Sequence, residues 1–305
     1  MTTIPLCDPA DPRPRAPRTR LPPGTVDTHF HVFGPIEDYP LAPTRGYTPP
    51  DAPLAQYEEL GRLLGFSRAV AVQPSVYGTD NRRILDAMRQ SAMSMRGVAV
   101  IDADLPEREL LRLHEQGIRG VRINPVFTAG TGFSIARPLA DRVRTLGWHL
   151  QFLADVSKIA DLARAVEALD IPVVFDHMGH VPAGKGVADK GFQALLGLVR
   201  DGRAWVKLSG AYRITAQRTP PPYGDAAPFA EALIAANPDR VLWASDWPHP
   251  SIPVPMPNDG DLVDMALGWA GEAEIRRKLF VTNAERLYGF EPILPAGSGH
   301  GDKNG

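Results

Sequence analysis

Short apolar runs alternate with longer amphipathic stretches from residue 25 onward. Several runs are apolar at nearly every position, which is typical of parallel strands covered on both faces. The stretches between them repeat apolar residues at helical spacing. The runs expected to form strands are 25–31, 68–74, 96–102, 118–123, 148–154, 171–177, 204–209 and 240–245. The stretches expected to form helices are 55–64, 81–93, 108–116, 139–146, 159–169, 192–199, 229–236, 272–279 and 283–288.

This alternation predicts an α/β fold with a parallel sheet. Eight strands separated by helices over roughly 250 residues indicate a (β/α)8 TIM barrel. A doubly wound sheet is the alternative, but no glycine-rich phosphate loop follows the first strand. We see no internal repeat and no second domain. We therefore predict a disordered Pro/Arg-rich leader over 1–24, one barrel domain over 25–294 and a flexible tail over 295–305.

Composition narrows the class of protein. The 305 residues are 44% hydrophobic and 22% charged, as in an ordinary soluble protein. The formal net charge of −2 gives no reason to expect a nucleic acid or a membrane as partner. The single cysteine, Cys7, cannot form an internal disulfide, and no apolar run approaches the ~20 residues of a membrane span. We expect a cytoplasmic protein, with a homo-oligomer left open.

Polar residues gather where the predicted strands end. His29 and His31 lie two residues apart at the end of the first strand, so their side chains face the same side. In a parallel barrel the carboxyl ends of all strands surround one mouth. The other polar residues at or just beyond strand ends are Ser75, Asp102, Arg122, Asp155, His177, Arg213 and Asp246.

Asp246 follows an apolar strand in the segment WASDWPH. Aspartates at such positions often cap helices or turns. Among three histidines at other strand ends, however, a general base that takes a proton from water is the better interpretation.

The remaining histidines differ in their expected roles. His177 closes a strand, where a satisfied core residue is common, but its position opposite His29 and His31 favours a functional role. His180 and His249 lie further into loops and are expected, at most, to contact a substrate. His149 begins a strand and is expected to be structural.

Arg122 lies within a buried strand and Arg213 just beyond another. A buried guanidinium needs an anionic partner because it cannot lose its charge. A substrate carboxylate is a natural candidate. Tyr47 and Ser75 can add neutral hydrogen bonds, or can simply cap backbone groups.

Three motifs carry a resemblance to a known family. The His-x-His pair, DHMG at 176–179 and WASDWPHP at 243–250 resemble the amidohydrolase superfamily of the amidohydrolase-2 type. Within it, the chain is similar to the branch of 2-pyrone-4,6-dicarboxylate lactonase and sugar-lactone hydrolases. The likeness runs through most of 25–290.

The resemblance implies a distorted barrel that hydrolyses a lactone. By that pattern His29, His31 and His177 polarise the lactone carbonyl. Asp246 activates the attacking water and later protonates the leaving oxygen. The positions that match substrate contacts of the family are Tyr47, Ser75, Arg122 and Arg213.

The resemblance also bears on metal content. The pyrone lactonase needs no metal, so no cofactor is expected here. A binuclear centre is disfavoured because no histidine ends the fifth strand and Arg122 cannot be a ligand. Three histidines and Asp246 can still hold one tetrahedral zinc, which remains the alternative.

The sequence departs from the pyrone lactonase near the expected carboxylate site. No second basic residue follows Arg122, His180 replaces an arginine, and no tyrosine stands near Leu153. We therefore expect a substrate with one anionic group, or with a differently placed one.

The hypothesis is a carboxylic ester hydrolase for a small anionic lactone of aromatic or sugar-acid catabolism. Such a lactone would be 2-pyrone-dicarboxylate-like, muconolactone-like or derived from a sugar acid. The alternatives are a zinc-dependent decarboxylase of an aromatic or unsaturated carboxylic acid, a lactone isomerase, and a binding protein without catalysis.

Overall fold

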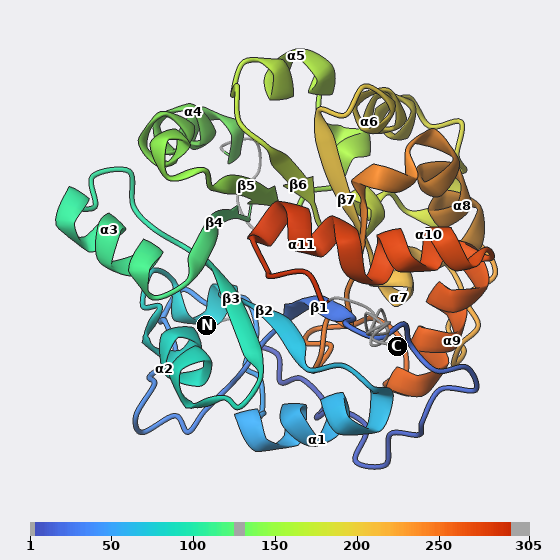
Figure 1. The fold of residues 1–305 in the computed structure, drawn as a ribbon, viewed down its shortest axis with the longest axis horizontal. Coiled ribbons are helices and arrows are strands. Elements are labelled where there is room, and N and C mark those ends of the chain that lie inside the picture. Colours follow the sequence, from blue (N-terminus) through green and yellow to red (C-terminus); the bar gives the residue numbers. More distant parts are fainter. Residues whose placement is uncertain (1–3, 125–131, 294–305) are drawn as a thin grey trace, which may run out of the picture.

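Eight parallel strands form one sheet in the order β1 to β8 in the computed structural model, which describes residues 4–124 and 132–293. A parallel bridge between Phe30 and Trp247 joins the two ends of the sheet, so the sheet is nearly closed (Figure 1). The strands are β1 Val26–Phe30, β2 Arg68–Val72, β3 Ser94–Ala99, β4 Ile118–Ile123, β5 His149–Phe152, β6 Val173–Phe175, β7 Ala204–Leu208 and β8 Val241–Trp243. The predicted (β/α)8 barrel is confirmed.

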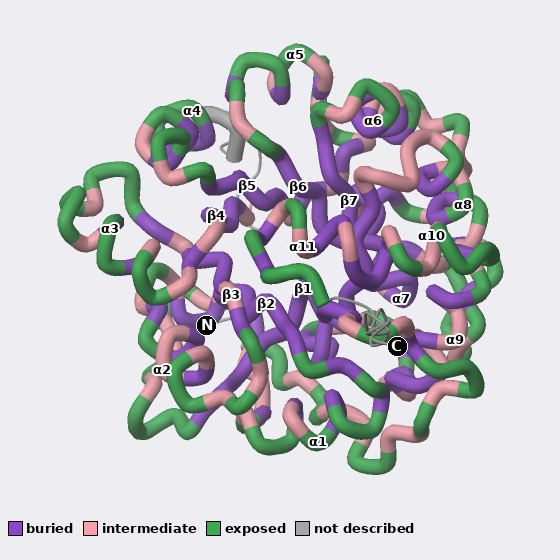
Figure 2. Tube along the Cα trace, in the orientation of Figure 1, coloured by how far each residue is buried: buried purple, intermediate pink, exposed green. Residues whose placement is uncertain are grey.

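Helices surround the strands, with their buried faces against the sheet (Figures 1 and 2). They are α1 Leu54–Leu64, α2 Arg82–Gln90, α3 Glu107–Glu115, α4 Gly132–Val143, α5 Leu162–Glu167, α6 Lys190–Arg200, α7 Ala211–Ile214, α8 Ala227–Ala236, α9 Asp259–Ala270, α10 Ala273–Arg277 and α11 Asn283–Tyr288. Helix α9 was not predicted. Its buried residues Val263, Ala266, Leu267 and Ala270 nevertheless repeat at helical spacing, a signal that the sequence contains.

A small apolar cluster fills one end of the barrel. It joins valines of several strands, such as Val26 and Val174, with Tyr288, the last residue of α11, and with Phe290. Val26 begins β1, and Phe290 lies under the guanidinium of Arg68, which begins β2, so these residues cover the amino-terminal end of the strands.

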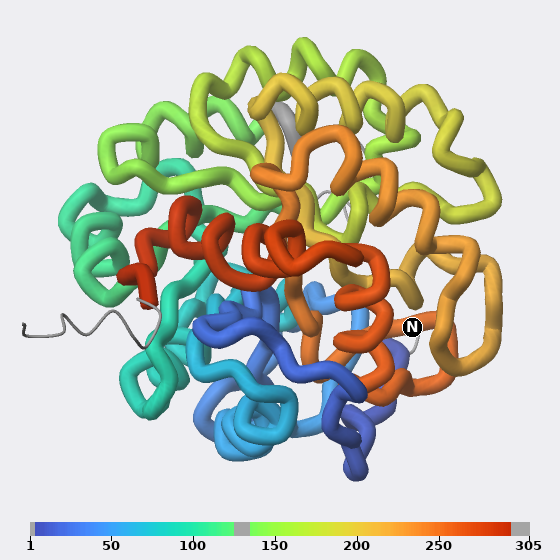
Figure 3. Tube along the Cα trace, turned by 45° about the vertical axis from the view of Figure 1, so that its right-hand side comes forward, coloured from blue at the N-terminus to red at the C-terminus, as the bar shows by residue number. Residues whose placement is uncertain are grey.

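The leader, residues 4–24, makes hydrogen bonds and ion pairs with the rest of the chain. Cys7 N–H donates to the carbonyl oxygen of Thr48 at 2.9 Å, and Thr48 N–H donates to that of Pro5 at 2.8 Å. The Arg15 guanidinium pairs with Asp264 at 2.7 Å and also with Asp261, both on α9. In Figure 3 the blue N-terminal segment accordingly lies against the orange segment that contains α9. These partners lie far away in the chain, so the leader's composition could not reveal them. The tail at 295–305 lies outside the described residues.

No helix in the described ranges is long and apolar enough to cross a bilayer.

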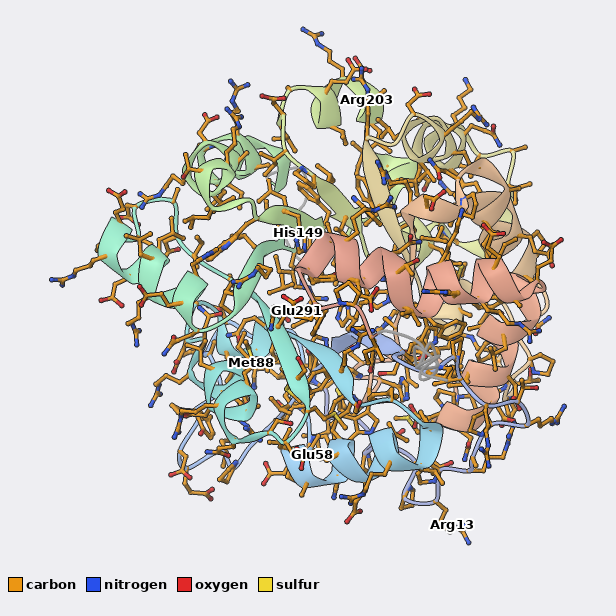
Figure 4. All side chains as sticks on the ribbon, in the orientation of Figure 1. Arg13, Glu58, Met88, His149, Arg203 and Glu291 are labelled. Atoms are coloured by element: carbon orange, nitrogen blue, oxygen red, sulfur yellow. The ribbon has the colours of Figure 1, made fainter. Side chains whose placement is uncertain are left out.

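His149 lies in the interior near the closed end of the barrel (Figure 4). Its ring meets that of Tyr288 edge-on at 5.2 Å, and a Cβ on Gly120 would approach the ring to 2.4 Å, so the neighbouring strand needs glycine there. Burial, and to a smaller extent the charge of Lys207, lowers the pKa of His149 from 6.5 to about 3. Between about pH 3 and pH 6.5 the ring is therefore neutral in the folded protein but protonated in the unfolded chain.

This shift predicts a pH-dependent cost to stability. Below pH 6.5 His149 binds a proton in the unfolded chain but not in the folded protein. The free energy of unfolding therefore falls as the pH falls toward 3. Relative to His149→Phe, the wild type should lose about 2 kcal/mol more between pH 6.5 and about pH 4.5. Urea unfolding of both proteins at the two pH values measures this difference. Parallel pH profiles would contradict the shifted pKa.

Candidate active site

Four buried side chains meet at the carboxyl end of the barrel. His29 comes from β1 and His31 follows it, while His177 and Asp246 follow β6 and β8. Asp246 Oδ1 lies 3.7 Å from Nε2 of His29, 3.9 Å from Nε2 of His31 and 3.7 Å from Nε2 of His177. The structure thus brings together the four residues that were predicted to share the mouth.

The backbone at two of these residues adopts the left-handed conformation. The φ angle is 63° at Asp246 and 51° at His177, values that are uncommon for residues other than glycine. Asp246 N–H donates to the carbonyl oxygen of His29 at 2.8 Å, which ties the end of β8 to β1. Such unusual backbone angles persist where surrounding contacts hold a side chain in a required direction.

The outer nitrogens of the three histidines have protein partners. His31 Nδ1 lies 2.7 Å from the carbonyl oxygen of Val72 and His29 Nδ1 lies 3.2 Å from Asp176 Oδ1. Because the carbonyl oxygen of Val72 only accepts, His31 Nδ1 carries the proton and its Nε2 lone pair faces inward. Lys207 Nζ, which only donates, lies 3.3 Å from His29 Nδ1, so the contacts of His29 fit either tautomer. His177 Nδ1 lies 2.9 Å from Ser209 Oγ.

Burial sets the charge of these rings. It lowers the pKa of His29 to about 4 and the pKa values of His31 and His177 well below 6.5. The Nε2 atoms of His29 and His31 are only 3.2 Å apart, and two lone pairs at that distance repel. The geometry therefore calls for a proton or a metal ion between them.

The two carboxylate oxygens of Asp246 have different surroundings. Oδ2 accepts hydrogen bonds from Tyr212 OH at 2.8 Å and from Arg213 Nε at 2.7 Å. Oδ1 has no hydrogen-bond partner among the described residues. Burial alone raises the pKa of Asp246, but Arg213 and the neighbouring histidines outweigh it and hold the pKa well below 3.8. The site therefore presents an ionised carboxylate with one free oxygen, as a general base requires.

Sequence reasoning missed two buried charged residues that contact His29, Lys207 and Asp176. Lys207 is fully buried, and its Nζ donates to Thr28 O at 2.9 Å and to Gln151 Oε1 at 2.8 Å. Asp176 Oδ1 lies 3.5 Å from Lys207 Nζ, and Asp176 Oδ2 accepts from Gln151 Nε2 at 3.1 Å. A lysine in the apolar run AWVKL was the available signal, because lysine is almost never buried without a partner.

The two predicted anion-binding arginines already have protein partners. Arg122 Nη1 donates to Gln73 O at 3.1 Å and Nη2 to Asp176 Oδ2 at 3.3 Å, while its Nε has no partner in the described ranges. Arg213 Nη2 lies 2.7 Å from Asp246 Oδ2 and 3.0 Å from Pro250 O. Arg122 therefore retains a free buried donor, whereas Arg213 primarily holds Asp246.

Tyr47 and Ser75 lie beside each other near these arginines. Burial raises the pKa of Tyr47 to about 12, so its hydroxyl stays protonated and can donate. Tyr47 precedes Thr48, the residue to which the leader binds, so the leader also supports this wall of the site.

His180 and His249, both predicted as substrate contacts, occupy different places. The His180 ring lies 5.4 Å from that of His177, and burial lowers its pKa to about 4. Its Nε2 finds no partner in the part of the chain described. His249 is buried, with Nδ1 2.8 Å from Tyr212 OH and Nε2 3.1 Å from Asp259 Oδ1. Both nitrogens of His249 are therefore engaged by protein groups on the side of Asp246 that faces away from the histidines.

The donor set also fits a metal ion. His29, His177 and Asp246 each offer a ligand atom, and these atoms lie within 4.8 Å of one another. The unpaired Asp246 Oδ1 and the inward Nε2 lone pairs suit a single zinc, with His31 as the fourth donor. Arg122 on β4 cannot coordinate, which disfavours a second ion.

Comparison with known proteins gives matches along the whole barrel. A sequence model of the amidohydrolase family matches residues 26–290. A 2-pyrone-4,6-dicarboxylate hydrolase of Comamonas testosteroni is 40% identical over 291 residues, which cover 92% of this chain and 95% of that protein. A 4-sulfomuconolactone hydrolase of Hydrogenophaga intermedia is 40% identical over 277 residues, which cover 88% and 90%. An apo crystal structure from Agrobacterium tumefaciens matches with a TM-score of 0.83 at 28% identity, covering 91% of this chain and 100% of that one.

Proposed function

The chain belongs to the amidohydrolase family, and we propose from this premise that it hydrolyses a small anionic lactone. Two relatives at 40% identity are lactone hydrolases by name, as the motif resemblance led us to expect. The observation that carries the proposal is the free oxygen of ionised Asp246, which faces three histidine nitrogens. This arrangement can activate water next to a polarised carbonyl.

In the proposed reaction Asp246 activates a water molecule, and the histidines opposite it polarise the lactone carbonyl. Asp246 Oδ1 takes a proton from water, whose oxygen forms a bond to the lactone carbonyl carbon. The proton held between Nε2 of His29 and Nε2 of His31 stabilises the carbonyl oxygen as it becomes negative. The ring C–O bond then breaks, and Asp246 returns the proton to the leaving oxygen. The product is an open-chain hydroxy acid, or its keto form.

Hydrolysis without a metal is the first version of this proposal. A proton held between Nε2 of His29 and Nε2 of His31, which lie 3.2 Å apart, then polarises the carbonyl. In the alternative, His29, His31, His177 and Asp246 would hold one zinc, which would act as a Lewis acid on the carbonyl.

Metal analysis separates the two versions. We expect the purified protein to contain far less than one zinc per chain and to keep its kcat after treatment with a chelator. Elemental analysis and steady-state kinetics on the same sample measure both quantities. Stoichiometric zinc, with activity lost to the chelator and restored by zinc alone, would establish the metal-dependent version instead.

The fixed charges favour a substrate with one anionic group. Arg122, Lys207 and Arg213 already pair with Asp176 and Asp246, so few cationic donors remain for a substrate carboxylate. The segment 125–131 contains no ionisable side chain that could add another. The free Nε of Arg122 is the donor available for a substrate carboxylate.

A panel of lactones with no, one or two acidic groups tests the function. We expect the highest kcat/KM for a monoanionic lactone, and one ¹⁸O atom in the new carboxylate when the reaction runs in H₂¹⁸O. Ring migration without ¹⁸O would indicate an isomerase. Release of CO₂ from an aromatic or unsaturated acid would indicate a decarboxylase. No turnover with any lactone would refute the proposal.

A further inference from the structure

A chain of buried hydrogen bonds leads away from the back of Asp246. Tyr212 OH lies 2.8 Å from Asp246 Oδ2 and 2.8 Å from His249 Nδ1. His249 Nε2 lies 3.1 Å from Asp259 Oδ1. Tyr212, His249 and Asp259 are all buried, and the reaction described above uses none of them.

We propose that Tyr212, His249 and Asp259 are positioning residues that hold Asp246 for proton transfer, an inference that rests on the proposed function. The ionised carboxylate of Asp246 only accepts, so Tyr212 must donate its one hydroxyl proton to Oδ2. The Tyr212 oxygen then accepts from Nδ1–H of His249, whose Nε2 contacts Asp259 Oδ1 on its other side. The hydrogen bonds from His249 to Tyr212 and from Tyr212 to Asp246 therefore point in the direction that the Asp246 carboxylate determines.

Two donors on one oxygen define the orientation of the carboxylate. Tyr212 and Arg213 are adjacent on the short helix α7, and both reach Oδ2 of Asp246. Rotation of the carboxylate would break both bonds, so Oδ1 is the oxygen that stays turned toward the histidines. His249 in turn holds the Tyr212 hydroxyl so that it cannot rotate away.

The far end of the chain is anchored in a helix. Asp259 is the first residue of α9, where a negative charge is favoured by the helix dipole. The N-cap Asn258 accepts from Gly260 N–H at 3.1 Å and donates to Asp11 of the leader at 2.8 Å. The three segments after β7, after β8 and at α9 are thus joined behind one carboxylate.

Removal of single hydroxyl groups tests the role of this chain. Tyr212→Phe should lower kcat about 10- to 100-fold, while KM stays within about twofold because the hydroxyl contacts Asp246 and not the substrate. Tyr223→Phe is the matched control. Its ring packs edge-on against Tyr212 at 6.3 Å, but its hydroxyl has no partner in the described part of the chain. This control should keep the kcat of the wild type.

A rescue at His249 separates positioning from packing. The φ of His249 is 60°, a conformation that both asparagine and glycine tolerate. His249→Asn retains a donor near the position of Nδ1 and should recover most of the kcat that His249→Gly loses. A ¹⁵N NMR spectrum of the wild type should also show a proton on His249 Nδ1, whatever the substrate is.

The outcomes distinguish this inference from the proposed function. If the wild type opens no lactone, the function fails, and the NMR result still decides the direction of the hydrogen bonds. If the wild type is active and Tyr212→Phe keeps its kcat, or loses only as much as Tyr223→Phe, the inference is overturned. A change confined to KM, or a His249 ring without a proton on Nδ1, overturns it as well.

Discussion

Asp246→Asn is expected to lower kcat for lactone hydrolysis by about a thousandfold or more, with the fold retained. The asparagine oxygen can still accept from Tyr212 and Arg213, while its NH₂ group would point to the inward Nε2 lone pairs. Asparagine also tolerates the φ of 63° at this position. The variant therefore loses the proton acceptor without losing its place in the site.

Steady-state kinetics, far-UV circular dichroism and binding of the hydroxy-acid product measure this separation. Asp102→Asn provides a matched control, because Asp102 also follows a barrel strand but is exposed. The control should retain normal turnover. Near-normal turnover by Asp246→Asn would remove Asp246 as the base, and with it the proposed course of the reaction.

Lys207→Met is expected to lower the free energy of unfolding by about 3 kcal/mol. Methionine has a similar volume, so the cost comes from the buried charge of Asp176, which would lose one of its two cationic partners. Arg122 and Gln151 still contact that carboxylate, which places the expected cost at the lower end of the range for broken buried ion pairs.

Urea denaturation of Lys207→Met, Asp176→Asn and the double variant measures the coupling between the two charges. The double variant should be more stable than the sum of the single losses predicts, by about 1 kcal/mol or more, because neither Lys207 nor Asp176 is then left without the other. Arg122 loses Asp176 in both Asp176→Asn and the double variant, so that cost cancels in the comparison. Strict additivity would show that Lys207 and Asp176 do not stabilise each other.

Much of the barrel and of its mouth could be predicted from the sequence. The eight strands were recognisable because each is a short apolar run, and runs buried on both faces differ clearly from amphipathic helices. The same reasoning placed His29, His31, His177 and Asp246 together, since carboxyl ends of parallel strands share one rim. Helix α9 was missed although its apolar spacing was visible.

The partners of those four residues could not be predicted in the same way. Lys207 and His29 are 178 residues apart in the chain, yet Nζ and Nδ1 lie 3.3 Å apart across the barrel. The partners of His249 were equally unpredictable. Its position after β8 predicted a contact with the substrate, but its ring contacts Tyr212 and Asp259 behind Asp246.

The sequence by itself determined the strand period, the barrel and the end of it that carries the polar side chains. Only the tertiary structure decided which buried charge neutralises which, how the leader is held, and which oxygen of Asp246 remains free. The physical reason is that periodicity is a local property of the backbone. A buried polar group, by contrast, must find its partner wherever closure of the barrel brings one within hydrogen-bonding distance.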